Sequence, residues 1–262
     1  MLFRSYWRQT LSRSIFSFEA GYGSEWGAYG LIKATVPVTE HVDSITDLNL
    51  YSKRGVGVGQ GFSWDYPSIK GELSGFYLKD QDPNRRFDTP LISEDRYRVK
   101  FEHLQNFTDT NYLNTKWNYL SDPKVLDEFF KEEYRRHAQP ENYASWVYGT
   151  PLFGSEAFVS KRLNDFYDNT DRLEYSADLY RTRLGGSPFY VKSENAIAYL
   201  ERNDAETNAP PIISYDSVRI DSANTLYMPQ RYGFISLVPR ASYRATYYSK
   251  APGDGEIGRA HV

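Results

Sequence analysis

The stretch NYLNTKWNYL, residues 111–120, alternates between two kinds of side chain from Leu113 to Tyr119. Bulky or apolar side chains fall on one parity and polar ones on the other: Leu113, Thr115, Trp117 and Tyr119 against Asn114, Lys116 and Asn118. A period of two is that of a β-strand with one apolar face and one polar face. The stretch therefore predicts a strand that lies between an apolar and a polar environment.

The same period recurs along the chain in segments of about ten residues. Strands are expected near residues 14–23, 26–36, 43–52, 56–65, 71–79, 96–105, 111–120, 142–151, 155–165, 172–181, 188–200, 222–229 and 234–249. The pattern predicts an all-β, antiparallel fold of about 12–13 strands. We expect these strands to form part of a larger transmembrane β-barrel, and a curved open sheet when taken alone.

The connections between these strands tend to alternate in length. The short ones are 37–42, 66–70, 106–110, 152–154, 182–187 and 230–233, and the long ones are 80–95, 121–141 and 201–221. Transmembrane barrels have tight periplasmic turns and longer outer loops, so the alternation favours a barrel over a soluble β-sandwich. Residues 53–55 break the pattern, because they form a tight connection in the outer series.

Composition excludes several classes of protein. The chain has 262 residues, Lys+Arg 31 against Asp+Glu 34, no Cys, and 16% aromatic residues. Without cysteine there is no disulfide scaffold, thiolate zinc site or cysteine nucleophile. The near-neutral charge gives no basic footprint for nucleic acid, and no run of 18 apolar residues predicts a transmembrane helix.

No motif in the chain points to catalysis, a metal or a cofactor. The glycines at 55, 57, 59 and 61 lie inside a predicted strand, so they predict small residues on its inner face rather than a phosphate loop. Residues 80–84 begin like a calcium loop but lack its glycine and closing glutamate, and we expect a solvated outer loop there. The histidines show no metal-ligand spacing. We expect no enzyme activity.

Residues 122–139 form the one segment with helical spacing. Asp122 is a plausible N-cap with Pro123 at the first helical position, and apolar residues follow at intervals of three and four. We expect a short amphipathic helix in an outer loop, packed on neighbouring loops.

Polar residues gather on the face that would line the lumen, and aromatic residues lie near strand ends on the opposite face. The polar set is Asp47, Asn49, Arg98, Lys100, Glu102, Asn114, Lys116, Asn118, Glu174, Asp178, Arg240 and Arg244. The aromatic set is Trp26, Trp64, Trp117, Tyr119 and Tyr247. A lining of mixed charge is typical of a water-filled or protein-plugged lumen. Aromatic residues near strand ends are typical of the girdle at a membrane interface.

The two ends of the chain differ from the rest. Back-translated, residues 1–5 and 256–262 are reverse complements over their shared stretch and resemble a common sequencing adapter. We expect the native sequence to be residues 6–255.

From about Ser14 to Tyr248 the order of strands and loops resembles the outer-membrane lipopolysaccharide-assembly protein family, LptD (also called OstA). The matching motifs are Asp43 with Tyr51-Ser52-Lys53-Arg54-Gly55, Trp64-Asp65-Tyr66, Gly71-Glu72-Leu73, Asp95-Arg96, Trp117 with Tyr119, Ser121-Asp122-Pro123, and Phe129-Phe130. Ser121-Asp122-Pro123 is the most specific of these.

The resemblance implies part of the barrel of a non-catalytic translocon that inserts lipopolysaccharide into the outer leaflet of a Gram-negative outer membrane. It implies a plug lipoprotein in the lumen, and a periplasmic lipopolysaccharide-transport bridge reached through an N-terminal domain outside this stretch. Candidate lumen contacts with anionic head groups or with the plug are Arg98, Lys100, Lys116, Arg240 and Arg244. They could instead pair with Glu102, Glu174 or Asp178.

Family members often carry prolines in the first two strands, which weaken pairing at a lateral gate. This chain has Gly21 and Gly23 in the first strand and Lys33 near the second proline position. Glycine weakens a strand by entropy and lost packing, so residues 14–23, with Gly21 and Gly23, are the hypothetical gate strand.

Two other classes of protein remain open. Another outer-membrane barrel, such as a porin or nutrient importer, predicts closure within one chain and no plug. A soluble carbohydrate-binding β-protein predicts that the apolar faces meet in a sandwich core.

Overall fold

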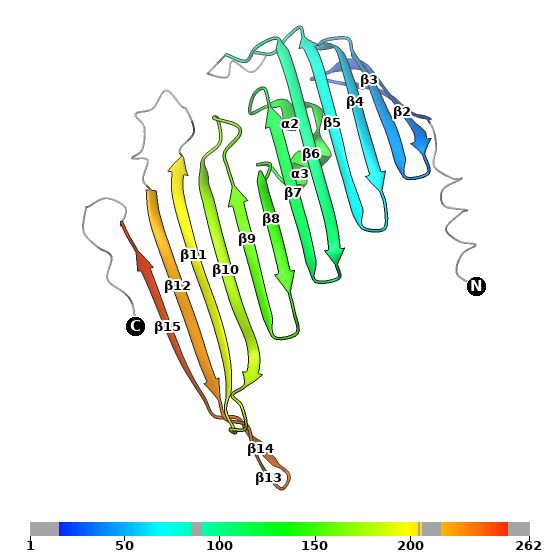
Figure 1. Ribbon diagram of the computed structural model, residues 1–262. Coiled ribbons are helices and arrows are strands. Elements are labelled where there is room, and N and C mark those ends of the chain that lie inside the picture. The colour runs from blue at the N-terminus through cyan, green and yellow to red at the C-terminus, as the bar shows by residue number, and fades with distance from the viewer. Residues whose placement is uncertain (1–15, 85–90, 204, 206–215, 251–262) are drawn as a thin grey trace. The chain divides into compact units, whose positions relative to one another are not determined.

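The computed structural model describes residues 16–84, 91–203, 205 and 216–250. The main element is a 13-stranded antiparallel sheet in which β1 to β12 are hydrogen-bonded in chain order and β15 pairs with β12 (Figure 1). The prediction of an all-β antiparallel sheet of about 12–13 strands is confirmed. β1 and β15 lie at the two ends of the strand order, so the described sheet is open.

The strands of the main sheet follow the predicted segments closely. They are β1 (Phe16–Gly23), β2 (Gly27–Thr39), β3 (Val42–Tyr51), β4 (Gly55–Asp65), β5 (Ile69–Asp80), β6 (Asp95–Thr108), β7 (Asn111–Leu120), β8 (Tyr143–Gly149), β9 (Phe153–Ser160), β10 (Asn169–Arg183), β11 (Tyr190–Asn203), β12 (Asp216–Tyr227) and β15 (Arg240–Tyr248). Residues 1–5 and 256–262, expected to be foreign to the native chain, lie outside the described residues.

The last part of the sheet differs from the prediction. The strand expected near 222–229 begins at Asp216, and the strand expected at 234–249 is divided in two. β13 (Gln230–Tyr232) and β14 (Ile235–Leu237) pair only with each other in a separate small hairpin, and β15 then joins β12. The division follows from Pro239, which cannot donate a ladder hydrogen bond and interrupts the strand.

The chain divides into two compact units. The first holds the described residues up to His103 together with Trp117–Pro140, and the second holds Leu104–Lys116 and the described residues from Glu141 onward.

In the first unit, apolar side chains lie on the exposed face of the sheet. In β4, Val56 and Val58 are 50% and 51% exposed, whereas Gly55, Gly57 and Gly59, which alternate with them, are buried. The same exposed face carries Leu48, Leu50, Phe62, Leu73, Tyr77, Tyr97, Val99, Trp117 and Tyr119. A soluble sheet buries its apolar face and exposes its polar face, and this unit has the opposite arrangement.

The second unit repeats this arrangement. Its exposed apolar side chains are Leu173, Tyr175, Ile197, Tyr199, Ile220, Tyr243 and Tyr247. The other face carries Glu174 and Asp221, which pair with Arg219 and Arg244 at 2.8 and 2.6 Å.

The space over Gly57 of β4 is filled by an aromatic ring of the chain itself. A Cβ added at Gly57 would lie 2.8 Å from Cζ of Phe76. Phe76 in turn contacts Phe129 and Phe130 at ring-centroid distances of 6.4 and 5.2 Å. Small residues on the inner face, as predicted, thus make room for a core of Tyr51, Phe76, Leu78 and Phe129.

The helical segment is broken into α2 (Val125–Phe129) and α3 (Lys131–Arg136), so the prediction of one helix from Asp122 is wrong. The break is at Phe130, whose φ of −126° and ψ of 49° are not helical. The carboxylate of Asp122 accepts from the backbone N–H of Lys124 at 2.9 Å, and Lys124 takes the N-cap position. Neither helix is long and apolar enough to cross a membrane, a finding limited to the described residues.

Two predicted locations are also corrected. Phe129 packs on Tyr51 of β3 and Phe76 of β5, so α2 lies on the inner face of the sheet instead of on neighbouring loops. Trp26, expected in an outward girdle, packs against the same core, whereas Trp117, Tyr119 and Tyr247 are exposed on the apolar face.

Candidate functional site

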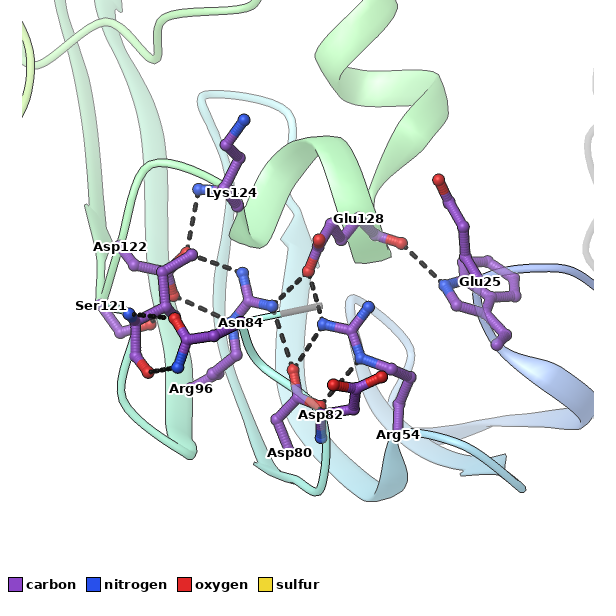
Figure 2. Close-up of polar contacts among 12 residues, drawn as sticks. Glu25, Arg54, Asp80, Asp82, Asn84, Arg96, Ser121, Asp122, Lys124 and Glu128 are labelled. Atoms are coloured by element: carbon purple, nitrogen blue, oxygen red, sulfur yellow. Dashed lines mark hydrogen bonds and ion pairs between the residues drawn. The ribbon is translucent and has the colours of Figure 1, made fainter. Parts of the chain in front are cut away.

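Five charged side chains from four separate segments meet on the inner face of the first unit. They are Arg54, Asp80, Arg96, Asp122 and Glu128, here called the clamp (Figure 2). Their side chains are between 0% and 8% exposed. Charges this deeply buried are stable only when they are paired and hydrogen-bonded.

Local sequence places the clamp residues at strand ends, in the connections next to them, and in α2. Arg54 lies in the turn between β3 and β4, directly before Gly55, which has a φ of +98°. A Cβ at Gly55 would lie 2.5 Å from the carbonyl oxygen of Lys79, so this position requires glycine. Asp80 is the last residue of β5 and pairs in register with Gly55. Arg96 is the second residue of β6.

Arg54 joins β5 to α2. Its Nε donates to Oδ1 of Asp80 at 2.8 Å, and its Nη2 donates to Oε2 of Glu128 at 2.6 Å. Burial opposes the charge, but the hydrogen bonds to Asp80 and Glu128 outweigh it, so the pKa of Arg54 lies above its ordinary value. Arg54 is therefore a permanent cation.

Arg96 contacts all three carboxylates. Its Nε and Nη2 donate to the two oxygens of Asp122 at 3.0 and 2.6 Å, a bidentate pair. Its Nη1 donates to Oδ2 of Asp80 at 3.1 Å and to Oε2 of Glu128. Arg96 thus links β5, the loop after β7, and α2 through one planar group.

The ring of Phe129 lies between the charged groups and the apolar core. The guanidinium carbons of Arg54 and Arg96 are each 5.0 Å from its centroid. The same ring also contacts the rings of Tyr51 and Phe76, at centroid distances of 5.6 and 6.4 Å. Cation–π attraction strengthens in such a desolvated place, so Phe129 and Glu128 fix α2 by two different forces.

Further contacts attach both helices to the sheet. Trp26 donates its indole N–H to the backbone oxygen of Glu128 at 2.9 Å, and Lys131 pairs with Glu25 at 2.7 Å. In α3, Glu133 accepts from Nη1 of Arg98 at 2.7 Å, and Arg98 also stacks on Phe130 at 4.7 Å.

The geometry of the clamp favours attachment over chemistry. Each of its three carboxylates accepts from an arginine, and none is left to act as a base or nucleophile. Within the described part of the chain, no group of His, Asp or Glu residues could hold a metal ion. What the clamp does is hold the segment after β7 on the inner face of the sheet.

Sequence reasoning found some clamp residues and missed others. Arg54, Arg96, Asp122 and Phe129 belong to four motifs quoted for the family resemblance, and the structure brings all four together. Asp80 was expected in a solvated loop, and that expectation is corrected. The residue is fully buried and pairs with Arg54 and Arg96. Glu128 was not singled out, although its position three residues after Val125 places it on the buried side of the helix.

The predicted lumen cations form local contacts. Arg98 is 5% exposed, donates a hydrogen bond to Asn118 and pairs with Glu133. The Nζ atom of Lys100 lies 3.6 Å from a carboxylate oxygen of Glu72 and 3.4 Å from one of Glu102. In the second unit, Lys116 lies 3.9 Å from Glu141, Arg244 pairs with Asp221, and Arg240 is exposed. Arg98 is thus bound to α3. Of the alternative partners Glu102, Glu174 and Asp178, Glu102 lies within ion-pair distance of Lys100, whereas Glu174 pairs with Arg219 and Arg172.

The two glycines of the hypothetical gate lie in β1, at one end of the strand order. Gly21 is opposite Tyr29, whose ring covers it: a Cβ there would lie 2.5 Å from the Tyr29 hydroxyl. Gly23 is opposite Gly27 and has open space around it.

No known protein family's sequence profile matches the chain. No curated protein matches it either. Among solved structures, the chain is similar to a bacterial polysaccharide outer membrane secretin, with a TM-score of 0.32 and 12% identity over 88% of this chain and 78% of that chain. A likeness at this level carries no argument about function.

Replacing the central arginine should loosen the clamp. In Arg96→Gln, three buried carboxylates would be left with one arginine, so we expect the free energy of unfolding to fall by about 3–5 kcal/mol. Equilibrium unfolding in urea measures it. The control is Lys79→Gln, which removes an exposed cation near Glu94 and Asp95 and should cost less than about 1 kcal/mol. Equal losses in the two variants would contradict the role of the clamp.

The attachment of α3 should weaken in acid. Burial opposes ionisation of Glu133, but the hydrogen bond from Arg98 outweighs it and lowers the pKa below the usual 4.5. A lowered folded-state pKa stabilises the contact above pH 4.5, and this contribution is lost as the pH falls through the folded pKa. Protection of the Lys131–Arg136 amides, corrected for intrinsic exchange, should therefore drop in that range.

Glu133→Gln should remove this pH dependence, whereas Glu132→Gln, on the exposed side of α3, should keep it. Unchanged pH dependence in Glu133→Gln would assign the effect to another group.

Proposed function

We propose that this chain is part of an outer-membrane β-barrel that inserts lipopolysaccharide into the outer leaflet. The observation that carries the proposal is the exposed apolar face of the strands, combined with a polar face that holds ion pairs. This is the arrangement of a sheet with lipid outside and water or protein inside.

Strand lengths are compatible with a membrane. β4 and β5 have 11 and 12 residues, and a tilted transmembrane strand needs about 9–11. Polar side chains on the outward face satisfy one another: Thr46 donates to Gln60 at 2.9 Å, and Gln60 donates to Ser44 at 2.9 Å. Mutual hydrogen bonding lowers the cost of placing such groups in lipid.

The proposal of lipopolysaccharide as cargo rests on the family resemblance. It is supported by the clamp, where Arg54, Arg96 and Asp122 from three of its motifs meet, with Phe129 of a fourth motif packed against the two arginines. In the proposed mechanism, the polar inner face accepts sugar and phosphate groups while acyl chains pass through an opened seam into lipid. A plug lipoprotein and a periplasmic transport bridge are the partners this mechanism needs.

Single-cysteine labelling tests the membrane orientation, since the chain has no native cysteine. We expect a polarity-sensitive probe at Val58→Cys or Ile197→Cys to be quenched by spin-labelled lipid, because both side chains are outward and about half exposed. A probe at Asn114→Cys on the polar face should be quenched only by a water-soluble quencher. Water-accessible probes at both outward positions would contradict the membrane proposal and favour a soluble β-protein.

Photo-crosslinking in cells tests the cargo. A photoreactive residue in place of Lys100, on the inner face, should form a lipopolysaccharide adduct, whereas one at the neighbouring Val99, on the outward face, should form much less. The adduct is detected by immunoblot after affinity purification. Membrane-inserted protein without an adduct at Lys100 would favour a porin or nutrient importer.

The gate hypothesis needs its own experiment. In the full-length protein, a disulfide between cysteines placed at Gly21 or Gly23 and the last strand of the barrel should block lipopolysaccharide export, because it locks the seam. Reduction should restore export. Normal export in the oxidised, cross-linked protein would rule out this strand as the gate.

A further inference from the structure

The small hairpin β13–β14 is an amphipathic element outside the main sheet. Its register pairs Tyr232 with Ile235 and Gln230 with Leu237, so these side chains share one face. Arg231 pairs with Ser236 on the other face. The hairpin is thus apolar on one side and polar on the other.

The apolar side of this hairpin is open to its surroundings. Tyr232 is 62% exposed, Ile235 and Leu237 are each 52% exposed, and Phe234 at the tip is 96% exposed. Gly233 next to it has a φ of +58°, which permits the tight turn. Figure 1 shows β13 and β14 projecting beyond the ends of β12 and β15.

The hairpin lies at the end of the second unit where other connections are short. At that end, β8 and β9 are joined by residues 150–152, and β10 and β11 by residues 184–189. The connection 228–239 instead extends into a hairpin of its own. Short connections mark the periplasmic end of outer-membrane barrels.

The charge in and directly beside the hairpin is positive. Residues 228–240 contain Arg231 and Arg240 and no Asp or Glu. Arg231 and Arg240 make no ion pair with any carboxylate in the described residues, and Arg231 bonds only the backbone oxygen of Gly233, at 3.3 Å.

We propose that the β13–β14 hairpin inserts its apolar face into the anionic phospholipid surface of the periplasmic leaflet. This inference rests on the proposed outer-membrane location. Exposed Phe and Tyr beside an arginine suit the boundary between head groups and acyl chains. An anionic surface would also neutralise the positive charge of Arg231 and Arg240. Such a surface attracts each basic residue by about 1 kcal/mol, which is about fivefold in partitioning.

The test uses the full chain reconstituted in phosphatidylethanolamine vesicles with and without phosphatidylglycerol. Single cysteines carry a polarity-sensitive probe at Leu237, on the apolar face, and at Ser236, on the polar face of the same hairpin. Gly186→Cys in the neighbouring turn is a second control, because a Cβ there meets open space. We expect spin-labelled lipid to quench Leu237→Cys only, and more strongly with phosphatidylglycerol.

Arg231→Gln should weaken the phosphatidylglycerol dependence about fivefold. Equal quenching of the probes at Leu237 and Ser236 would overturn the inference. A probe at Leu237 that is shielded from both water and lipid would also overturn it, and would indicate a protein partner. The probe at Ile197→Cys separates the two proposals. If it is quenched by lipid while Leu237 is not, only the hairpin inference fails, and if it is not quenched, the membrane location fails.

Discussion

The guanidinium of Arg96 is the group on which the first unit depends. It is fully buried, and it bonds Asp80, Asp122 and Glu128, which come from a strand end, a loop and a helix. A single planar cation that satisfies three carboxylates fixes all three segments at once. A buried charge network of this kind contributes less to stability than to the choice of one arrangement, because its desolvation cost offsets most of its attraction.

That arrangement has its apolar and polar surfaces reversed relative to a soluble protein. The clamp and the helices cover a polar face, and the large apolar side chains of the strands remain exposed. Gly57 of β4 allows this covering, since the ring of Phe76, which contacts Phe129 and Phe130, occupies the space that a larger residue would fill. Core, clamp and helix are therefore one structure, in which removal of any part exposes the others.

The second unit is held by different means. Its inner-face ion pairs, Arg219–Glu174 and Arg244–Asp221, are partly exposed, with Arg244 at 70%. Exposed pairs of this kind contribute little, so backbone pairing along long strands carries most of the stability there. β10, of 15 residues, is the longest strand of the sheet, and β11 has 14, as many as β6.

Sequence alone determined the strands, their antiparallel order and their two-faced character, because a period of two is a local property that survives in every context. It also determined the presence of a helical segment and the inward position of charges such as Lys100 and Asp47. Only the tertiary structure decided that Arg54, Asp80, Arg96 and Glu128 meet. Their contacts join residues between 16 and 74 positions apart, and no local pattern encodes such a meeting. The same holds for Trp26, whose neighbours in sequence suggest an outward ring but whose partner, the backbone of Glu128, lies 102 residues away on the inner face.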